Sequence, residues 1–523
     1  MEATCRRVLL IGLDAADPNL ICEAIDRGDL PALRGLRDEG AWGPVSFPPG
    51  FGSGAVWPSF STGVLPARHG RYFYRQVRPG RYEAARFEAD QFEAKSFWEE
   101  ICTAGRRVAV FDVPKMGLSE RIDGVEVVDW LVHGPVYHEL RTNPASFAAE
   151  LAARFGTDPL PKCDLPGGRD ARQQAELLDV LRGRIATKAE ASRHFMSQEK
   201  WDLFVTVFAE PHCVGHQSWH VRDPAHPQHD PEAHALIGDP VLEVYQAIDR
   251  AIGELIEDLD DDVCVIVVSC TGMGPNYTGN LLLDEVLRRL EGLRKPVVLD
   301  AWLRLKRRVK TLLPVSVRRR GRQLSRRVDE RAAHADRERR RFFVVPHNDM
   351  TGAVRMNLVG RELRGRVRPD EVDALFESLR EDLLELRNLD TGGRVVADVV
   401  RTADHCGGEH LSRLPDFFVI WKRDAPIERV GSPKIGEVAY RHRGNRTGDH
   451  RAESIFFARG RGVRAGRIDR VSVLDFASTV ATLVGVELTG TDGEPIRELW
   501  PDAERAGVRL QRVMRSPAGA SRA

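Results

Sequence analysis

Short apolar runs bounded by turn residues recur along the chain and alternate with amphipathic stretches. The runs are residues 8–13, 108–111, 203–208, 263–269, 417–421 and 455–457. Continuous apolar runs of this length are typical of strands covered on both faces of a sheet, and their alternation with helical stretches favours parallel βαβ units. The pattern predicts an α/β fold with a mostly parallel central sheet, helices on both faces, and insertions.

Polar residues directly follow three of the predicted strands. Asp14 follows the first run, Glu210 and His212 follow the third, and Cys270 and Thr271 follow the fourth. In open α/β sheets, ligands bind at the carboxyl ends of the strands. These five positions are therefore the first candidates for a functional site.

The composition changes near residue 301. Lys and Arg accumulate in residues 301–341, and residues 510–523 are rich in Arg, Ser, Gly and Ala. We expect residues 1–300 and 342–509 to form a single domain, with 301–341 as a basic helical insertion and 510–523 as a flexible tail. The insertion is either a solvated helical excursion or a surface for peripheral contact with an anionic membrane.

The overall charge and the cysteines limit the partners and the cellular location that we expect. With 77 basic and 77 acidic residues and a pI near 7.3, no whole-molecule field indicates a nucleic-acid partner. The eight cysteines include no CxxC pair, which favours reduced thiols, and no segment has the roughly 20 apolar residues of a membrane span. A cytoplasmic protein is expected, and its oligomeric state stays open.

Histidines are concentrated after the third predicted strand. His212 and His216 are four residues apart, so on a helical turn they share one face and can converge on one metal ion. Further along the chain, His450 lies in a Gly-Asp-His element just before the last apolar run. A buried, hydrogen-bonded core histidine is the plain alternative for His450.

A glycine-rich segment and its neighbours carry a family resemblance. Residues 50–63 contain Gly-Ser-Gly and end in a Thr-Gly pair, and residues 66–70 read Pro-Ala-Arg-His-Gly. With the strand-end Asp14, these segments resemble the alkaline phosphatase superfamily, on the type I phosphodiesterase/nucleotide pyrophosphatase branch. The resemblance implies that Ser53, nine residues before Thr62, is a nucleophile that attacks phosphorus.

The same resemblance implies a metal site. Relatives place ligands of one ion at His216 and His450, and have an Asp where this chain has His212. Either His212 is itself a ligand or Glu210 substitutes for that Asp. A site of three histidines with one open position suits zinc. We expect one zinc ion, and a second ion is in question.

The second metal site of the family looks dismantled. Relatives hold that ion with the strand-end Asp, the nucleophile and a Ser-Asp-His-Gly element, for which this chain has Ser-Cys-Thr-Gly. Cys270 and Thr271 therefore replace two ligands, and Asp14 with Ser53 alone cannot hold the ion tightly. Cys270 is a thiolate ligand of a rebuilt site, a nucleophile, or an inert residue of a decayed site.

Two functions remain open. The first is a metal-dependent hydrolase or transferase that acts on a small-molecule phosphate ester or nucleotide-like substrate. The second is a pseudoenzyme that binds a phosphorylated ligand or a protein partner. Arg355 and Asn357 lie in a segment that resembles bacterial relatives, and are weaker candidates for substrate contacts.

Overall fold

The structure is a computed structural model that describes residues 7–87, 92–160, 163–164, 168–293, 334–348, 350–441 and 444–500. Most of the predicted basic insertion 301–341, and all of the predicted tail 510–523, lie outside the described residues. The expectations for both segments, including the membrane contact, therefore stay predictions.

The central sheet contains the first strand in its interior. Its order is β20-β2-β19-β9-β1-β8-β5-β6-β7, with β21 also paired to β2. The bounds are β1 (Arg7–Leu13), β2 (Ala41–Ser46), β5 (Val108–Phe111), β6 (Gly124–Val128), β7 (Arg141–Asn143), β8 (Leu203–Phe208), β9 (Val263–Ser269), β19 (Ser454–Arg459), β20 (Gly466–Arg467) and β21 (Val471–Ser472). Strands β9, β1, β8, β5 and β6 run parallel, while β19 and β7 are antiparallel.

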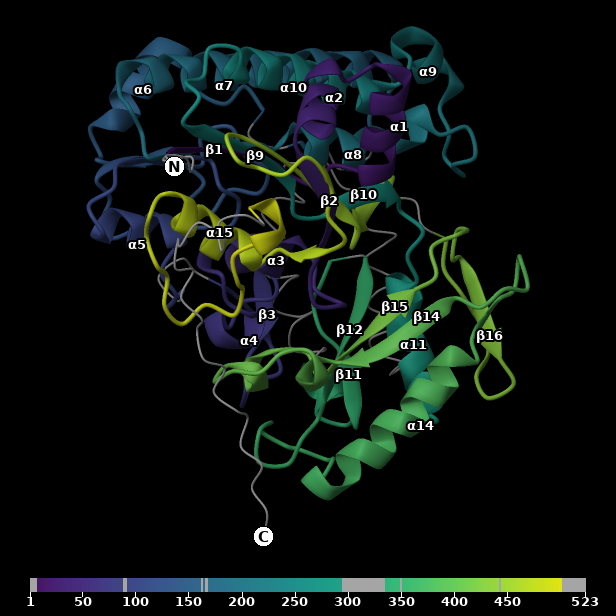
Figure 1. Ribbon diagram of the computed structural model, residues 1–523. Coiled ribbons are helices and arrows are strands. Elements are labelled where there is room, and N and C mark those ends of the chain that lie inside the picture. The colour runs from purple at the N-terminus through teal and green to yellow at the C-terminus, as the bar shows by residue number, and fades with distance from the viewer. Residues whose placement is uncertain are drawn as a thin grey trace.

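Helices cover both faces of this sheet, so the predicted α/β class is confirmed (Figure 1). Side chains alternate along β1: Leu9 and Ile11 enter one core, and Val8 and Leu10 enter the other. The first core is closed by α1 (Pro18–Arg27), α2 (Pro31–Glu39), α6 (Phe147–Phe155), α7 (Ala171–Gln198), α8 (Glu210–Arg222) and α10 (Pro240–Ile256). The second is closed by α3 (Ser53–Thr62), α5 (Phe97–Thr103) and α15 (Asp475–Leu483).

A second, antiparallel sheet forms a separate lobe at the lower right of Figure 1. Its order is β11-β12-β15-β14, with bounds β11 (Phe342–Val344), β12 (Thr351–Met356), β14 (Val396–Arg401) and β15 (Phe417–Trp421). Helices α11 (Asn280–Leu290) and α14 (Val372–Leu384) pack on it around a core of their own.

Two of the predicted parallel strands are therefore corrected. Residues 417–421 form β15 of the second sheet, and residues 455–457 lie in β19, which is antiparallel to β9. The prediction that both belong to parallel βαβ units was wrong. An apolar run records burial on both faces of a strand, but it records neither the partner strand nor the direction of pairing.

The remaining α-helices and strands of the described residues are short. They are α4 (Pro66–His69), α9 (Pro231–Ile237), β3 (Arg75–Val77), β4 (Ala84–Arg86), β10 (Gly272–Pro275), β13 (Arg387–Asn388), β16 (Arg429–Ser432), β17 (Gly436–Ala439) and β18 (Gly448–Arg451). Within the described ranges, none of the helices combines the length and the apolar character that crossing a bilayer requires.

The segment before α3 lies where the two lobes meet. Phe51 packs edge-on against Phe418 of β15, with ring centroids 4.9 Å apart. Gly50 has φ +93, and a Cβ there would come within 2.3 Å of the Phe418 ring, so this close approach requires glycine. The start of α3, and with it Ser53, is thereby held against the second sheet.

Candidate metal centre

Three buried histidines converge beside the carboxyl ends of the central strands. His212 and His216 lie on α8, which begins directly after β8, and His450 lies on β18. One ligand nitrogen from each ring lies within 4.8 Å of the others, and the ring centroids are 4.6 to 4.9 Å apart. The structure thus brings together the three histidines that the sequence predicted, here called the three-histidine cluster.

Each ring of the cluster has one nitrogen facing a protein partner. Nδ1 of His212 lies 2.6 Å from Oδ2 of Asp14, and Nδ1 of His216 lies 2.7 Å from the carbonyl oxygen of Gly448. Nε2 of His450 lies 3.4 Å from Oγ of Ser53. Metal-binding histidines typically use one nitrogen in this way and present the other to the ion.

Within the part of the chain that the structure describes, the second ring nitrogens of His216 and His450 lack protein partners. Among the described residues, buried Nε2 of His216 and buried Nδ1 of His450 have no hydrogen-bond partner. Burial lowers the pKa of His212, His216 and His450 well below the usual value, so all three are neutral near neutral pH. Neutral imidazole is the form that binds a metal, and the donor set therefore fits an ion.

Asp14 lies behind His212, where both its carboxylate oxygens have partners. Oδ1 accepts a hydrogen bond of 2.8 Å from Nε1 of Trp57, and Oδ2 faces Nδ1 of His212. The next residue, Ala15, has φ 58, a conformation that non-glycine residues rarely adopt. The structure thus places Asp14 as the carboxylate that orients His212, and its role as a direct ligand stays a prediction.

Glu210 points away from the cluster, although it follows β8 as His212 does. It is fully buried and pairs with Arg184, whose Nε lies 3.1 Å from Oε1. Of the two alternatives that the sequence left open for the missing carboxylate ligand, the geometry favours His212, because His212 lies in the cluster and Glu210 is held by Arg184.

Ser53 is the first residue of α3 and lies at the edge of the cluster. Its Oγ is 3.4 Å from Nε2 of His450 and accepts a 3.3 Å hydrogen bond from Nδ2 of Asn348. A Cβ on Gly52 would come within 2.7 Å of Asn348, so the glycine lets this side chain approach. Asn348 was not predicted as a site residue, because its contact with Ser53 depends on how the second lobe docks.

Cys270 and Thr271 follow β9, as predicted, but the Cys270 side chain belongs to the apolar core beneath the sheet. It is 2% exposed, and burial raises the pKa of its thiol well above the usual value, so the thiolate is disfavoured. Among the described residues, buried Oγ1 of Thr271 has no hydrogen-bond partner. These features disfavour Cys270 as a nucleophilic thiolate, and its role as a ligand of a rebuilt site or as an inert residue stays a prediction.

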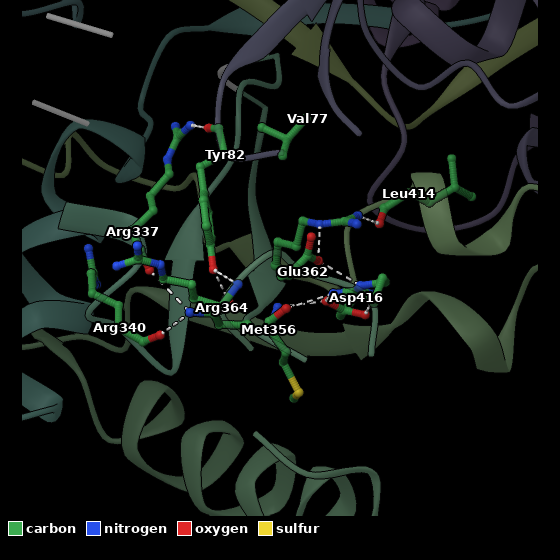
Figure 2. Close-up of polar contacts among 12 residues, drawn as sticks. Val77, Tyr82, Arg337, Arg340, Met356, Glu362, Arg364, Leu414 and Asp416 are labelled. Carbon is green, nitrogen blue, oxygen red and sulfur yellow. Dashed lines mark hydrogen bonds and ion pairs between the residues drawn. The ribbon is translucent and has the colours of Figure 1, made fainter. Parts of the chain in front are cut away.

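Arg355 and Asn357 lie in and after β12 of the second sheet, where protein groups surround them. Arg355 donates to Oε1 of Glu362 and to the carbonyl oxygen of Leu414, at 2.7 and 3.0 Å. Asn357 accepts from Tyr82 and donates to the carbonyl oxygen of Arg340, each at 2.8 Å. Figure 2 shows these partners, and the described contacts do not join either residue to the three-histidine cluster. A substrate role for them stays a prediction.

Sequence reasoning missed His133. It follows β6, and its ring stacks on His212 with centroids 3.9 Å apart and planes 24° apart. Nδ1 of His133 also faces the thiols of Cys163 and Cys213. The sequence shows that Cys213 is adjacent to His212, but this adjacency does not point to His133 or Cys163.

The fold and this centre define an α/β protein with a candidate metal site next to a helix-start serine. A family model, type I phosphodiesterase / nucleotide pyrophosphatase, matches residues 8–449. The chain therefore belongs to the type I phosphodiesterase/nucleotide pyrophosphatase family, within the alkaline phosphatase superfamily that the motifs indicated. Membership supports metal-dependent hydrolysis of phosphate esters as the class of activity.

A solved structure shares the fold at low sequence identity. Murine ectonucleotide pyrophosphatase / phosphodiesterase 5, as an inactive variant in complex with AMP, matches with a TM-score of 0.50 and 12% identity over 94% of this chain and 99% of that chain. The human protein of the same name matches with a TM-score of 0.48 and 13% identity, with the same coverage. No curated protein sequence matches the chain.

Proposed function

We propose that this chain is a zinc-dependent hydrolase of phosphate esters whose metal is held by His212, His216 and His450. The observation that carries the proposal is that one nitrogen of each ring faces a protein partner, while Nε2 of His216 and Nδ1 of His450 have no partner among the described residues. Three neutral imidazoles with an open fourth position suit zinc. A reducing cytoplasm is the proposed setting, since the described cysteines are all free thiols.

The residues around Ser53 favour its ionised form. If Nδ1 of His450 binds the metal, its Nε2 carries the proton and donates to Oγ of Ser53, which already accepts from Asn348. Backbone N–H groups at the start of α3 favour the negative charge that gathers on phosphate oxygens. When bound, zinc supplies Lewis-acid polarisation of the phosphoryl group.

The proposed substrate is a small phosphodiester, including nucleotide-like ones. Support comes from family membership, and from the AMP complex of the murine structure, which is a property of that protein. Oγ of Ser53 forms a bond to phosphorus as the bond to the leaving ester oxygen breaks, and water then releases the phosphoryl group from the serine. Asp14 holds the His212 ring in the tautomer that presents Nε2.

A pseudoenzyme is the second candidate, and Cys270 is the observation that favours it. It stands where the family resemblance places an Asp ligand of the second ion, and its thiol is buried in the apolar core. Losing one of two ions removes several kcal/mol of transition-state stabilisation. As a pseudoenzyme, the protein would bind a phosphorylated ligand at this site without catalysing its hydrolysis.

The test is hydrolysis of a chromogenic aryl phosphodiester by purified protein in the presence of zinc. Ser53→Ala should lower kcat by about a hundredfold or more, because it removes the nucleophile. Ser59→Ala is the matched control: Ser59 lies on the same helix and also contacts a buried histidine, with Oγ 2.9 Å from Nε2 of His69, but away from the cluster.

Two results would argue against the proposal. If Ser53→Ala keeps the wild-type kcat, the serine is not the nucleophile. If the wild-type protein binds AMP or an aryl phosphate and shows no turnover with zinc bound, the chain is a pseudoenzyme.

A further inference from the structure

A second cluster of metal-binding side chains adjoins the three-histidine cluster. It consists of His133, Cys163 and Cys213, here called the thiol cluster, and one donor atom of each lies within 4.8 Å of the others. Nδ1 of His133 is 2.9 Å from Sγ of Cys163 and 3.4 Å from Sγ of Cys213. The three residues come from the loop after β6, the segment after α6 and the first turn of α8.

The spacing of the three donors is close to what a tetrahedral ion needs. Zinc bonds of roughly 2.3 Å to sulfur and 2.05 Å to nitrogen, at tetrahedral angles, put the nitrogen about 3.5 Å from each sulfur. The observed separations of 2.9 and 3.4 Å reach this value with small rotations of the side chains. Cys163 and Cys213 are 5% and 1% exposed, so the donors face one another away from bulk water.

Without an ion, this arrangement is poorly satisfied. Neutral His133 has a single nitrogen between the two sulfurs, and at most one hydrogen can lie between that nitrogen and either of them. A thiol is also a weak donor and a weak acceptor. An ion placed among the three atoms contacts all of them at once, whereas without it they are linked in pairs through weak thiol hydrogen bonds.

Charged groups of both signs surround the cluster. Lys115 donates from Nζ to the carbonyl oxygen of His133 at 3.1 Å, and Arg169 donates to the carbonyl oxygen of Cys163 at 2.6 Å. An Arg446 guanidinium nitrogen lies 3.5 Å from Nε2 of His133. Arg169 favours negative charge on both sulfurs, whereas Asp164 opposes it on Cys163 and Glu210 opposes it on Cys213. An ion bound by the sulfurs therefore has to displace their protons itself.

We propose that His133, Cys163 and Cys213 bind a second zinc ion. Binding releases the two thiol protons to solvent, the two thiolates neutralise the charge of the divalent ion, and no oxidation state changes. Two thiolates and one imidazole are a donor set that zinc takes in proteins, and they exclude hard ions such as magnesium and calcium. The site is separate from the family's second metal position, which in this chain holds Cys270 and Thr271.

The two clusters are joined through α8. Cys213 follows His212 in that helix, and the His133 ring stacks on the His212 ring at 3.9 Å. An ion on the thiol cluster fixes the His133 ring and the first turn of α8, and so holds His212 where it faces Asp14. The thiol cluster is therefore a positioning site for the three-histidine cluster. Metal binding by the thiols does not depend on the proposed hydrolase activity.

Cobalt substitution of the wild-type protein tests the proposal directly. Cobalt bound to thiolates gives an intense sulfur-to-metal charge-transfer band in the near ultraviolet, which imidazole ligands do not give. We expect this band in wild-type protein loaded with Co²⁺ under reducing conditions, and about two zinc ions per chain in protein purified without chelators. Absence of the band in wild-type protein overturns the proposal, whatever the activity.

Variants assign the band to these residues. Cys163→Ser and Cys213→Ser should each abolish it and lower the zinc content by about one ion, whereas His216→Ala should lower the zinc content and keep the band. Cys406→Ser is the matched control, a buried thiol outside both clusters, and should change neither. A band that survives Cys213→Ser, or a Cys163–Cys213 disulfide found by mass spectrometry in freshly purified protein, overturns the proposal.

The proposed function fails by a different route. An inactive protein that shows the charge-transfer band in wild type and in His216→Ala refutes the hydrolase and keeps the thiol site. An active protein without the band does the reverse.

Discussion

Among single residues, position 212 decides what Asp14 can do. An imidazole there faces Oδ2 of Asp14 at 2.6 Å, and Trp57 occupies Oδ1. The family resemblance implies a carboxylate at position 212 in relatives, and such a carboxylate would repel Asp14 and leave its oxygens for a metal. We infer that His212 and the Cys270-Thr271 pair are linked, because the resemblance places ligands of the same second ion at Asp14, Cys270 and Thr271.

This link gives a prediction about restoring that position. Changing Cys270→Asp and Thr271→His supplies the missing ligands, and adding His212→Asp frees Asp14 to join them. The triple variant should hydrolyse an aryl phosphodiester about tenfold faster or more, and more than the double variant does, because a second ion stabilises the attacking and leaving oxygens. Steady-state kinetics together with metal content check this.

The matched control carries Cys270→Asn in place of Cys270→Asp, which keeps the size of the side chain and removes its charge. It should show no gain in rate or metal. If the triple variant folds, by circular dichroism, and still gains neither metal nor activity over this control, the decay of the second position extends beyond these three residues.

Among the elements, the packing of β18 on α8 sets the distance between His450 and the other two histidines. The backbone N–H of Thr447 donates to the carbonyl oxygen of His216 at 2.8 Å, and Gly448 lies directly against Gly215. A Cβ on Gly448 would come within 2.2 Å of the Gly215 carbonyl oxygen, a backbone atom that cannot rotate away. The contact therefore needs glycine for space.

Gly448→Ala should accordingly push β18 away from α8. We expect it to lower the free energy of unfolding by about 1 to 3 kcal/mol and to weaken zinc binding by the three-histidine cluster, because His450 moves with its strand. Denaturant unfolding and zinc titration measure the two effects. Gly35→Ala is the control, since a Cβ there meets nothing within 4 Å on α2, and it should leave zinc affinity unchanged.

The elements also show where sequence reasoning ends. The apolar runs located their strands, since burial on both faces is written into each run. The run does not specify the partner of its strand, because the partner depends on the path of the chain between the two strands. For that reason the prediction placed β15 and β19 wrongly. Spacing within one helix was enough to pair His212 with His216, and resemblance added His450.

Across the whole molecule, the site depends on loops that meet only in the folded chain. Asn348 reaches Ser53 from the second lobe, and His133 and Cys163 reach Cys213 across the first. No periodicity connects such residues. The sequence therefore predicted the three-histidine cluster, but it did not predict the adjacent thiol cluster or the contact of the Asn348 side chain with Ser53. The motifs contained local information, whereas the contact of Asn348 is set by how the two lobes dock and the thiol cluster is set by how loops of the first lobe meet.

The same burial makes stability depend on pH. Burial lowers the pKa of His69 to about 3 and that of His133 and His347 to about 4, against an ordinary value of 6.5. As the pH falls below 6.5, these histidines take up protons in the unfolded chain and stay neutral in the folded one. Stability is therefore fully present above pH 6.5 and is lost as the pH falls toward 4.

Each such histidine contributes a slope of about 1.4 kcal/mol per pH unit in that window. His69 offers the clearest test, because Nε2 faces Oγ of Ser59 and Nδ1 accepts from the backbone of Arg71, so a proton on Nδ1 breaks a buried hydrogen bond. Urea unfolding with chelator present, from pH 7 to 4.5, should show a slope lower by about 1.4 kcal/mol per pH unit in His69→Gln than in wild type. His405→Gln, at an exposed histidine, should leave the slope unchanged. An equal slope in His69→Gln and wild type would mean that His69 takes up its proton in the folded chain as readily as in the unfolded one.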